Sequence, residues 1–400
     1  MAFKKAINSP IFSEISNYCS NNNIECYVVG GFVRDFFLHR ECKDVDILII
    51  GDGISAAKKI ANTIDPNISV TVFKNFGTAY FKYKEYEIEF VGSRKESYVS
   101  SSRNPIVQSG TLEDDINRRD FKINSIAISL NKHNFGELVD LHDGLSDINQ
   151  KIINTPLDSN ITFSDDPLRM LRAIRFSCQL DFEIHPELIN TMTKLKERIS
   201  IITSERIIDE INKIILTKTP SEGFKILEKT GLLKLIIPEL TNLKGIDEIE
   251  GQKHKDNFYH TLEVLDNICL NTNSLWLRWA ALLHDIGKAP TKKFNKKIGW
   301  TFHGHEFEGS KMVYKLFKRL KMPLNDKMKY VQKLVLMSSR PIVLAQENVT
   351  DSAVRRLIFD AGEAVDDLMT LCEADITTKN KNRFKKYHDN FRVVREKIIT

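Results

Sequence analysis

The sequence reads Gly30-Gly31-Phe32-Val33-Arg34-Asp35 and, nine residues later, Asp44-Val45-Asp46-Ile47-Leu48-Ile49-Ile50. Alternate residues of a β-strand share a face, so Asp44 and Asp46 point the same way. Two like charges side by side on a sheet are destabilising unless a cation lies between them. Mg²⁺ takes oxygen ligands and shares the rest of its shell with substrate phosphates. The small-residue turn with its arginine, followed by this acid pair, therefore indicates a site for a nucleoside triphosphate and its metal.

An Asp-x-Asp pair by itself is more typical of a solvated strand edge, but the upstream Gly-Gly-x-x-Arg-Asp favours the metal site. A third carboxylate is expected from Tyr86-Glu87-Ile88-Glu89-Phe90, where both glutamates share a strand face. We assign Glu89 as the third catalytic acid and interpret Glu87 as solvated. Three clustered acids suit a two-metal site for in-line phosphoryl or nucleotidyl transfer.

Composition is that of a soluble protein, with 42% hydrophobic and 28% charged residues in a chain of 400. This length predicts two to four domains. No stretch is long and apolar enough to span a bilayer, and the N-terminus has no apolar signal core, so we expect a cytoplasmic protein with no membrane partner. The six cysteines form no C-x-x-C pair, which fits a reducing compartment.

The net charge of +5 neither proves nor opposes nucleic-acid binding. Lysines are concentrated in the C-terminal half, at 292–293, 296–297, 311–333 and 379–386. Two interpretations remain open for them. They are solvated helix faces, or they form a track along a phosphate backbone.

Short strands and helices alternate between residues 9 and 150. Strands are expected at 25–29, 45–50, 70–74 and 78–94, the last long enough to bend or to contain a hairpin. Helices are expected at 32–39 and 54–63. Ser97 to Gly110 is polar and contains Pro105, so it reads as a loop. Beyond about residue 150 the pattern is almost entirely helical, which predicts an α+β fold with a small mixed sheet followed by helices.

Arg118-Arg119-Asp120-Phe121 is expected on a helix that begins near Leu112. The guanidinium of Arg119 can clamp a phosphate, and Asp120 can orient that arginine or meet a ribose hydroxyl. A surface salt-bridge cluster is the alternative for such a tetrapeptide.

Asp166 and Arg169 are three residues apart on an expected helix, so they share a face. The carboxylate can accept from an exocyclic amino group while the guanidinium donates to the adjacent ring nitrogen. Cytosine and adenine match this polarity, whereas guanine and uracil present the opposite one. An ordinary intrahelical salt bridge is the alternative. Arg172 and Arg175 continue the same row toward the expected phosphates.

The C-terminal half contains His260, the pair His284-Asp285 and Asp375, an H…HD…D series. Imidazole and carboxylate ligands suit a divalent transition metal, or Mg²⁺, that activates water. His303 and His305 follow, and His305 is a candidate ligand of a second metal. The alternative is that these histidines are structural.

Taken together, these motifs resemble the bacterial class II CCA-adding enzymes (tRNA nucleotidyltransferases) and their poly(A) polymerase relatives, fused to an HD domain. The resemblance covers roughly residues 25–380. Its specific parts are the motif around Asp44, the segment from Leu112 to Phe121 and the segment from Asp165 to Phe176. One departure is Leu38-His39-Arg40, which lacks the usual glycine after the first helix.

The resemblance implies roles for individual residues. Asp44 and Asp46 hold Mg²⁺, and with Glu89 they are the catalytic acids. The residues that bind the nucleotide are Gly30, Gly31, Arg34, Arg119, Asp120, Asp166, Arg169, Arg172 and Arg175, of which Asp166 and Arg169 read the base. His260, His284, Asp285 and Asp375 form the HD site, which is expected to hold a second divalent metal.

The implied architecture is α+β with four parts. They are a nucleotidyltransferase head (1–150), a helical neck and body that select the base and bind RNA (151–250), an HD metal-binding domain (251–380) and a helical tail (381–400). Relatives often continue beyond this point, so a truncated tail is an open alternative.

The implied function is template-independent addition of C, C and A to the 3′ end of tRNA, with CTP and ATP as donors and pyrophosphate as the leaving group. Poly(A) polymerase, CC-only and A-only activities are alternatives, and the polar segment from Ser97 to Gly110 argues against a CC-only enzyme. From another class, an HD-type phosphohydrolase that uses the head to bind RNA is the remaining alternative.

Overall fold

The computed structural model describes residues 5–74, 77–97, 106–346, 350–378 and 380–399. The chain folds as two compact units, one of residues 1–173 and 181–195 and the other of residues 174–180 and 196–400. Helix α7 (Leu168–Leu180) runs from the first unit into the second. The predicted α+β fold class, a head with a mixed sheet followed by a helical remainder, is confirmed.

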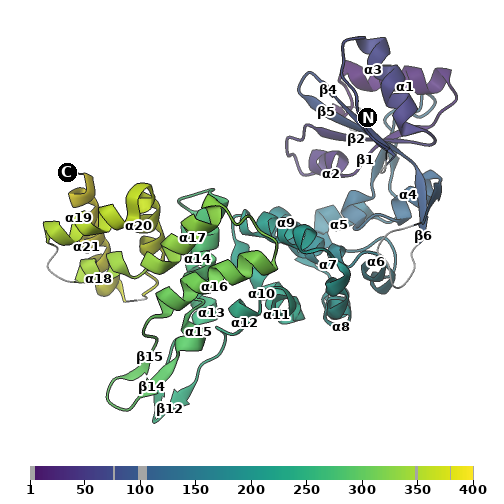
Figure 1. Cartoon of the computed structure of the whole chain (residues 1–400). Helices are drawn as coiled ribbons and strands as arrows, with labels where there is room; N and C mark the ends of the chain where they lie inside the picture. Colours follow the sequence, from purple (N-terminus) through teal and green to yellow (C-terminus); the bar gives the residue numbers. More distant parts are fainter. Residues whose placement is uncertain (1–4, 75–76, 98–105, 347–349, 379, 400) are drawn as a thin grey trace. The chain divides into compact units, whose positions relative to one another are not determined.

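A seven-stranded sheet forms the centre of the first unit, in the order β3-β4-β5-β2-β1-β8-β9. Its strands β1, β2, β4 and β5 are labelled in Figure 1. The strands are β1 (Cys26–Val29), β2 (Asp44–Ile49), β3 (Thr71–Phe73), β4 (Thr78–Tyr83), β5 (Tyr86–Gly92), β8 (Ala127–Ser129) and β9 (Leu138–Val139). β2 and β5 are parallel and the other neighbours are antiparallel, so the sheet is mixed. The expected strand at 78–94 is the hairpin β4–β5.

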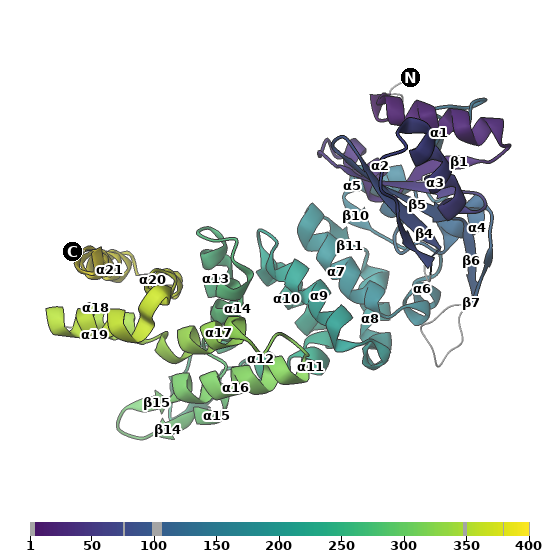
Figure 2. The ribbon, with the colours of Figure 1, turned by 45° about the horizontal axis from the view of Figure 1, so that its top comes forward.

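Helices cover this sheet and continue the first unit. They are α1 (Pro10–Asn21), α2 (Gly31–Phe37), α3 (Gly53–Ile64), α4 (Leu112–Asn117), η3 (Lys122–Asn124), α5 (Gly144–Gln150), α6 (Ser159–Asp165) and α8 (Pro186–Leu195). α3 packs on β2, β4 and β5, and α1 packs on α3 (Figure 2). A Cβ at Gly53 would lie 2.7 Å from the backbone nitrogen of Gly92, so this close approach of helix and strand requires glycine.

Two further pairs of strands belong to the first unit. β6 (Arg94–Ser97) and β7 (Ile106–Ser109) are antiparallel, and β10 (Ile152–Ile153) is parallel to β11 (Glu183–Ile184). The prediction of a loop at 97–110 is therefore wrong at Ser97 and at 106–109, where the backbone pairs as strands. Residues 98–105 lie outside the described residues.

The second unit is built of helices with two short hairpins. Its helices after α7 are η4 (Lys196–Ile201), α9 (Ser204–Ile215), α10 (Pro220–Thr230), α11 (Leu232–Ile236), α12 (Pro238–Thr241), α13 (Asn257–Cys269), α14 (Leu275–Leu283), α15 (Lys288–Thr291), α16 (His305–Arg319), α17 (Asp326–Met337), α18 (Arg340–Gln346), α19 (Asp351–Ala361), η5 (Gly362–Ala364), α20 (Val365–Ala374) and α21 (Lys381–Ile399). The hairpins pair β12 (Glu248–Ile249) with β13 (Gln252–Lys253), and β14 (Lys293–Asn295) with β15 (Gly299–Thr301).

Buried apolar faces hold these helices together. α13, α14 and α20 contact one another, and α16 packs along α17. Trp279 and Phe317 are fully buried between helices of this unit. None of the described helices combines the length and the apolar character needed to cross a membrane. The four-part division expected from the sequence stays an interpretation.

His39 has the left-handed backbone that is expected of the glycine that this chain lacks after the first helix. His39 follows α2 and has φ of +53°, a conformation that glycine adopts without strain and other residues adopt at a cost. The chain therefore keeps the backbone of a glycine-terminated helix with a different residue.

Candidate active site and metal centre

Carboxylates lie together at the centre of the sheet. The parallel register of β2 and β5 pairs Asp46 with Glu89, so their side chains project from the same face. Asp44 precedes Asp46 by two residues on β2 and shares that face. Glu87 instead forms an ion pair with Lys82 at 2.6 Å and is partly exposed, in agreement with its interpretation as a solvated residue.

The surroundings of Asp46 oppose its ionisation. Burial raises its pKa to about 6, and the neighbouring Glu89 and Asp44 carboxylates add to this effect, while the Arg119 guanidinium acts against it. A carboxylate whose charge is disfavoured by adjacent carboxylates gains stability when a cation is bound among them. The donor set consists of oxygens, so it suits a hard divalent cation such as Mg²⁺.

Gly30 brings the turn before α2 against these acids. Its φ is +75°, and a Cβ there would lie 2.9 Å from Asp46 Oδ2 and 3.3 Å from Arg119 Nη1. Only glycine allows this close approach of backbone, carboxylate and guanidinium. Gly30, Asp46 and Arg119, which were predicted from separate motifs, are thus brought together.

Asp115 holds the two arginines of the Arg118-Arg119-Asp120-Phe121 motif. Its carboxylate is fully buried, and its Oδ1 accepts from Arg118 Nε at 2.9 Å while its Oδ2 accepts from Arg119 Nη2 at 2.9 Å. Helix α4 ends at Asn117, so the expectation that this motif lies on the helix is wrong. The arginines instead fold back onto the last turn, three and four residues after Asp115.

A chain of hydrogen bonds joins the Gly-Gly-x-x-Arg-Asp motif to α7. Arg34 donates from Nε and Nη2 to Asp35, at 2.8 and 2.9 Å, and from Nη1 to Asn124 Oδ1 at 2.8 Å. Asn124 Nδ2 donates to Asp120 Oδ1 at 3.1 Å, and Asp120 Oδ2 accepts from Arg172 Nε at 2.8 Å. Burial raises the pKa of Asp120, but the charges of Arg172 and Arg169 and the hydrogen bond from Asn124 together outweigh burial and lower the pKa to about 2. Asp120 is therefore ionised at any ordinary pH.

The predicted base-reading pair differs from expectation in one respect. Asp166 lies before the first residue of α7 with extended backbone (φ −137°, ψ 101°), so it does not share a helix face with Arg169. The ring of Pro167 disfavours helical backbone at the residue before it. Asp166 Oδ1 accepts from Leu168 N at 3.1 Å, and Arg169 Nη2 donates to Arg118 O at 2.6 Å.

Arg175 belongs to the part of α7 in the second unit. Its Nε donates to Glu210 Oε2 on α9 at 2.7 Å, and its guanidinium stacks on the ring of Phe176. The structure therefore gives Arg175 a packing role within that unit. Its assignment as a nucleotide-binding residue stays a prediction.

The H…HD…D series converges within the second unit. The Nε2 atom of His260 lies 2.8 Å from Asp375 Oδ1 and 3.6 Å from Asp285 Oδ2. The Nε2 atom of His284 lies 3.8 Å from Asp375 Oδ1 and 3.4 Å from Asp285 Oδ2. Ligand atoms of His260, His284 and Asp285 all lie within 4.8 Å of one another. The arrangement offers two imidazoles and the Asp285 carboxylate to one point, with the Asp375 carboxylate beside the two imidazoles.

The ring of His284 is held by one nitrogen, which leaves the other available to a metal. Its Nδ1 donates to Ala281 O at 2.7 Å, which fixes the ring, while its buried Nε2 makes no hydrogen bond with any described residue. Burial lowers the pKa of His284, but the Asp285 and Asp375 carboxylates overcome this and raise it to about 9. A metal bound at Nε2 would displace that proton, as metals do at imidazole ligands.

Two cations and a further histidine surround this centre. Lys288 Nζ lies 2.7 Å from Asp285 Oδ2, and Lys255 Nζ lies 2.9 Å from His260 Nδ1. His305 Nε2 lies 3.6 Å from Asp285 Oδ1, whereas His303 is exposed. Of the two further candidates from the sequence, the structure brings only His305 to the centre.

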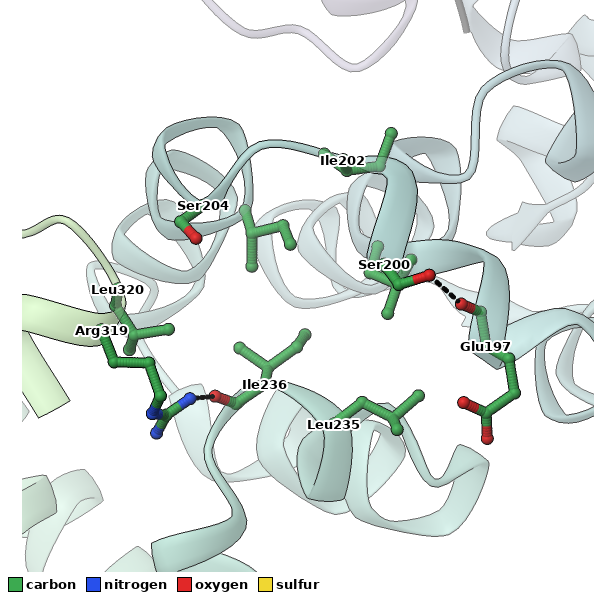
Figure 3. A pocket seen from close by; sticks show the side chains of 10 residues that line it. Glu197, Ser200, Ile202, Ser204, Leu235, Ile236, Arg319 and Leu320 are labelled. Carbon is green, nitrogen blue, oxygen red and sulfur yellow. Dashed lines mark hydrogen bonds between the residues drawn. The ribbon is translucent and has the colours of Figure 1, made fainter. Parts of the chain in front are cut away.

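A separate pocket of about 230 Å³ lies between η4, α9, α11 and the end of α16 (Figure 3). Its walls are Glu197, Ile199, Ser200, Ile202, Ser204, Ile207, Leu235, Ile236, Arg319 and Leu320. Arg319 is fixed there by donating to Ile236 O at 2.8 Å. None of the site residues predicted from the sequence lines this pocket.

Asp115 and Asn124 are functional residues that were not predicted from the sequence. The helical spacing of three and four residues from Asp115 to the arginines was a signal that could have revealed the first. Asn124 had no such signal, because its partners Arg34 and Asp120 come from different parts of the first unit.

Three family models match the chain. They are the poly A polymerase head domain at residues 26–154, the "probable RNA and SrmB-binding site of polymerase A" at residues 181–244 and the HD domain at residues 257–377. The second of these models contains most of the pocket described above.

The chain is similar to several curated proteins. The "Multifunctional CCA protein" of Mannheimia succiniciproducens is 30% identical over 383 residues, which cover 91% of this chain and 86% of that protein. The protein of the same name from Psychromonas ingrahamii is 33% identical over 313 residues, 75% of this chain and 71% of that protein. The "A-adding tRNA nucleotidyltransferase" of Aquifex aeolicus is 28% identical over 376 residues, and the chain spans only 44% of that protein's length.

Solved structures share the fold. A tRNA nucleotidyltransferase complexed with a primer tRNA and an incoming ATP analogue matches with a TM-score of 0.66 and 23% identity, covering 96% of this chain and 99% of that chain. The Thermotoga maritima CCA-adding enzyme complexed with tRNA matches with a TM-score of 0.69 and 20% identity, covering 98% and 82%.

Proposed function

The chain belongs to the family of CCA-adding enzymes and poly(A) polymerases, and we propose that it adds C, C and A to the 3′ end of tRNA without a template. CTP and ATP are the donors, and pyrophosphate leaves. The observation that carries this proposal is the pairing of Asp46 with Glu89 on adjacent parallel strands, beside Gly30 and Arg119. A tRNA substrate would place the protein in the cytoplasm.

In the proposed reaction, the terminal 3′-oxygen of tRNA bonds to the α-phosphorus of the nucleotide. The bond from that phosphorus to the bridging oxygen breaks, and the hydroxyl proton passes to solvent. Mg²⁺ held by Asp44, Asp46 and Glu89 would supply hydroxyl activation and neutralisation of the triphosphate. Asp115 fixes the guanidinium of Arg119 beside Gly30 and Asp46, where it can bind a phosphate of the nucleotide.

Base selection is proposed for Asp166 and Arg169. The carboxylate would accept from the exocyclic amino group of cytosine or adenine, and the guanidinium would donate to the adjacent ring nitrogen. Arg169 donates to Arg118 O in this structure, so base binding exchanges that hydrogen bond for one to the nucleotide. Asp166→Ala is then expected to weaken selection of C and A against U and G.

A-only addition is the nearest alternative, because the similar relatives include an A-adding enzyme as well as multifunctional CCA proteins. The chain spans 86% of a multifunctional CCA protein but 44% of an A-adding relative. The decisive assay offers tRNA that lacks its last one, two or three nucleotides together with each nucleoside triphosphate separately. Extension of all three substrates with C, C and A in order supports the proposal. Extension of only one of the three tRNA substrates would show a CC-only or A-only enzyme instead. A long run of added A would show a poly(A) polymerase.

Variants test the assigned acids in the same assay. Asp46→Ala and Glu89→Gln are expected to abolish incorporation. Glu87→Gln is the matched control, because Glu87 lies on the same strand as Glu89 but is paired with Lys82. If Asp46→Ala still incorporates nucleotide, the assignment of the acids is wrong.

For the second unit we propose a divalent metal held by His260, His284, Asp285 and Asp375. The buried Nε2 of His284, which makes no hydrogen bond with a described residue and lies 3.4 Å from Asp285 Oδ2, supports this proposal. Loading chelator-treated protein with Mn²⁺, Co²⁺, Ni²⁺ or Zn²⁺ and counting bound metal tests it. Asp285→Asn should lose the metal, whereas the exposed His303 should tolerate substitution by alanine. An unchanged metal content in Asp285→Asn would refute the site.

A further inference from the structure

Asn124 contacts three of the residues assigned to the nucleotide. Its Oδ1 accepts from Arg34 Nη1 at 2.8 Å, its Nδ2 donates to Asp120 Oδ1 at 3.1 Å and its backbone oxygen accepts from Arg119 Nη1 at 3.3 Å. The side chain is buried, with 7% of its surface exposed. Asn124 thus joins groups that the sequence presents as separate motifs.

These contacts connect two ends of the proposed site. Arg119 lies against Gly30 and Asp46, where the acids gather. Asp120 holds Arg172, which lies on α7 next to the segment assigned to base reading. A side chain that touches both partners can make their positions depend on each other, because buried hydrogen-bond networks act as units.

The carboxamide is chemically specific at this position. Arg34 is buried and needs acceptors for its N–H groups, of which Asp35 takes two and Asn124 one. Asp120 is an ionised acceptor, as its lowered pKa supports, and needs a donor from Asn124. An amide supplies one acceptor and one donor together, whereas a carboxylate supplies only acceptors.

We propose that Asn124 is a positioning residue that couples the triphosphate-binding arginines to the base-reading helix. Both the rate of nucleotide addition and the choice of base then depend on its amide. This inference rests on the proposed nucleotidyl transfer and deepens it, since it assigns the coupling of its two subsites to one side chain.

Asn124→Asp is the sharpest test, because it keeps the size of the side chain and the acceptor for Arg34. It removes the donor to Asp120 and places a like charge beside that carboxylate. We expect kcat/KM for CTP and ATP to fall on the order of 100-fold, since small misplacements at reacting groups have effects of that size. Preference for C and A over U and G should fall by about tenfold, a change that a purely structural role would not produce.

Asn131→Asp is the matched control. Asn131 is also buried, with 6% exposed, and its amide is also used on both sides, accepting from Cys26 N at 2.9 Å and donating to Ser129 Oγ at 3.0 Å. It touches none of the residues assigned to the nucleotide. Loss of folded protein in Asn131→Asp without a change in base preference is therefore the expected pattern for an ordinary buried asparagine.

The double variant Asp120→Asn with Asn124→Asp reverses the donor and the acceptor of the hydrogen bond. If Asn124 acts through Asp120, this exchange should restore base preference relative to Asn124→Asp alone. If Asn124→Asp fails to fold, Asn124→Ser is used instead, because serine is too short to contact both Arg34 and Asp120 and adds no charge. Its kcat/KM and base preference are measured in the same way.

Unchanged base preference and unchanged kcat/KM in a folded Asn124 variant would overturn the inference. So would an equal change of base preference in Asn131→Asp. Failure of the wild-type protein to extend tRNA would instead overturn the proposed function, so the two failures are distinguished by the wild-type lane of the same experiment.

Discussion

Replacing Asp46 by asparagine should make the first unit more stable while it abolishes activity. In the absence of metal, burial together with the Glu89 and Asp44 carboxylates raises the pKa of Asp46 to about 6, from 3.8 in the unfolded chain. A carboxyl group with a raised pKa favours the folded state fully below its unfolded pKa. That contribution is lost as the pH rises through the folded pKa. Asparagine has the same shape and no charge to bury.

The size of the effect follows from the shift. About 6 minus 3.8 is about 2 pKa units, and each unit corresponds to about 1.4 kcal/mol, so the penalty above pH 6 reaches about 3 kcal/mol. The gain from Asp46→Asn should be near zero at pH 3.5, grow between pH 4 and pH 6 and remain constant above pH 6.5. Such gains are expected where a site sacrifices stability for function.

Hydrogen exchange of the backbone amides in β2 and β5 measures this gain within the first unit of the whole protein. Opening free energies are compared between wild type and Asp46→Asn from pH 4 to pH 8 in the presence of a chelator. Glu87→Gln is the control, because Glu87 is partly exposed and paired with Lys82, and it should show no such gain. Saturating Mg²⁺ should stabilise only the wild type, so the difference in opening free energy between wild type and Asp46→Asn should become smaller.

Two results would refute this reasoning. One is an Asp46→Asn protein that is less stable than the wild type at pH 8 without metal. The other is a difference of the same size at pH 4 and at pH 8, because a gain that arises from ionisation must disappear where the carboxyl group is protonated.

Gly30→Ala should lower single-turnover incorporation at least tenfold, because its Cβ would lie 2.9 Å from Asp46 Oδ2. Asp115→Asn should cost about 3 kcal/mol in urea unfolding and raise KM for CTP and ATP, because it removes a fully buried carboxylate that pairs with two partly buried arginines. His284→Ala should remove bound metal, measured by elemental analysis, and leave tRNA extension intact. His39→Gly should raise the free energy of unfolding by about 1 kcal/mol without changing activity, because it relieves a left-handed backbone at φ +53°.

Local spacing in the sequence was sufficient for much of this protein. The period of two residues in a strand put Asp44 and Asp46 on one face, and β2 has the predicted place in the chain. The hairpin at 78–94 and the helices at α2 and α3 also follow from local pattern. The H…HD…D series gathers as expected, because its two histidines and two aspartates lie on or next to buried helices that pack together.

Contacts between residues that are distant in the sequence depend on the tertiary structure. Asp46 faces Glu89 because two strands that are far apart in the chain pair in parallel at one register. Asn124 joins Arg34 to Asp120 because burial leaves their polar atoms no solvent, so they must bond to one another. Asp166 lies outside its expected helix because of the proline that follows it. Arg175 is bound by Glu210, and both residues belong to the second unit. Spacing along the chain fixes which side chains share a face, but the pairing of strands and the satisfaction of buried polar groups depend on the whole fold.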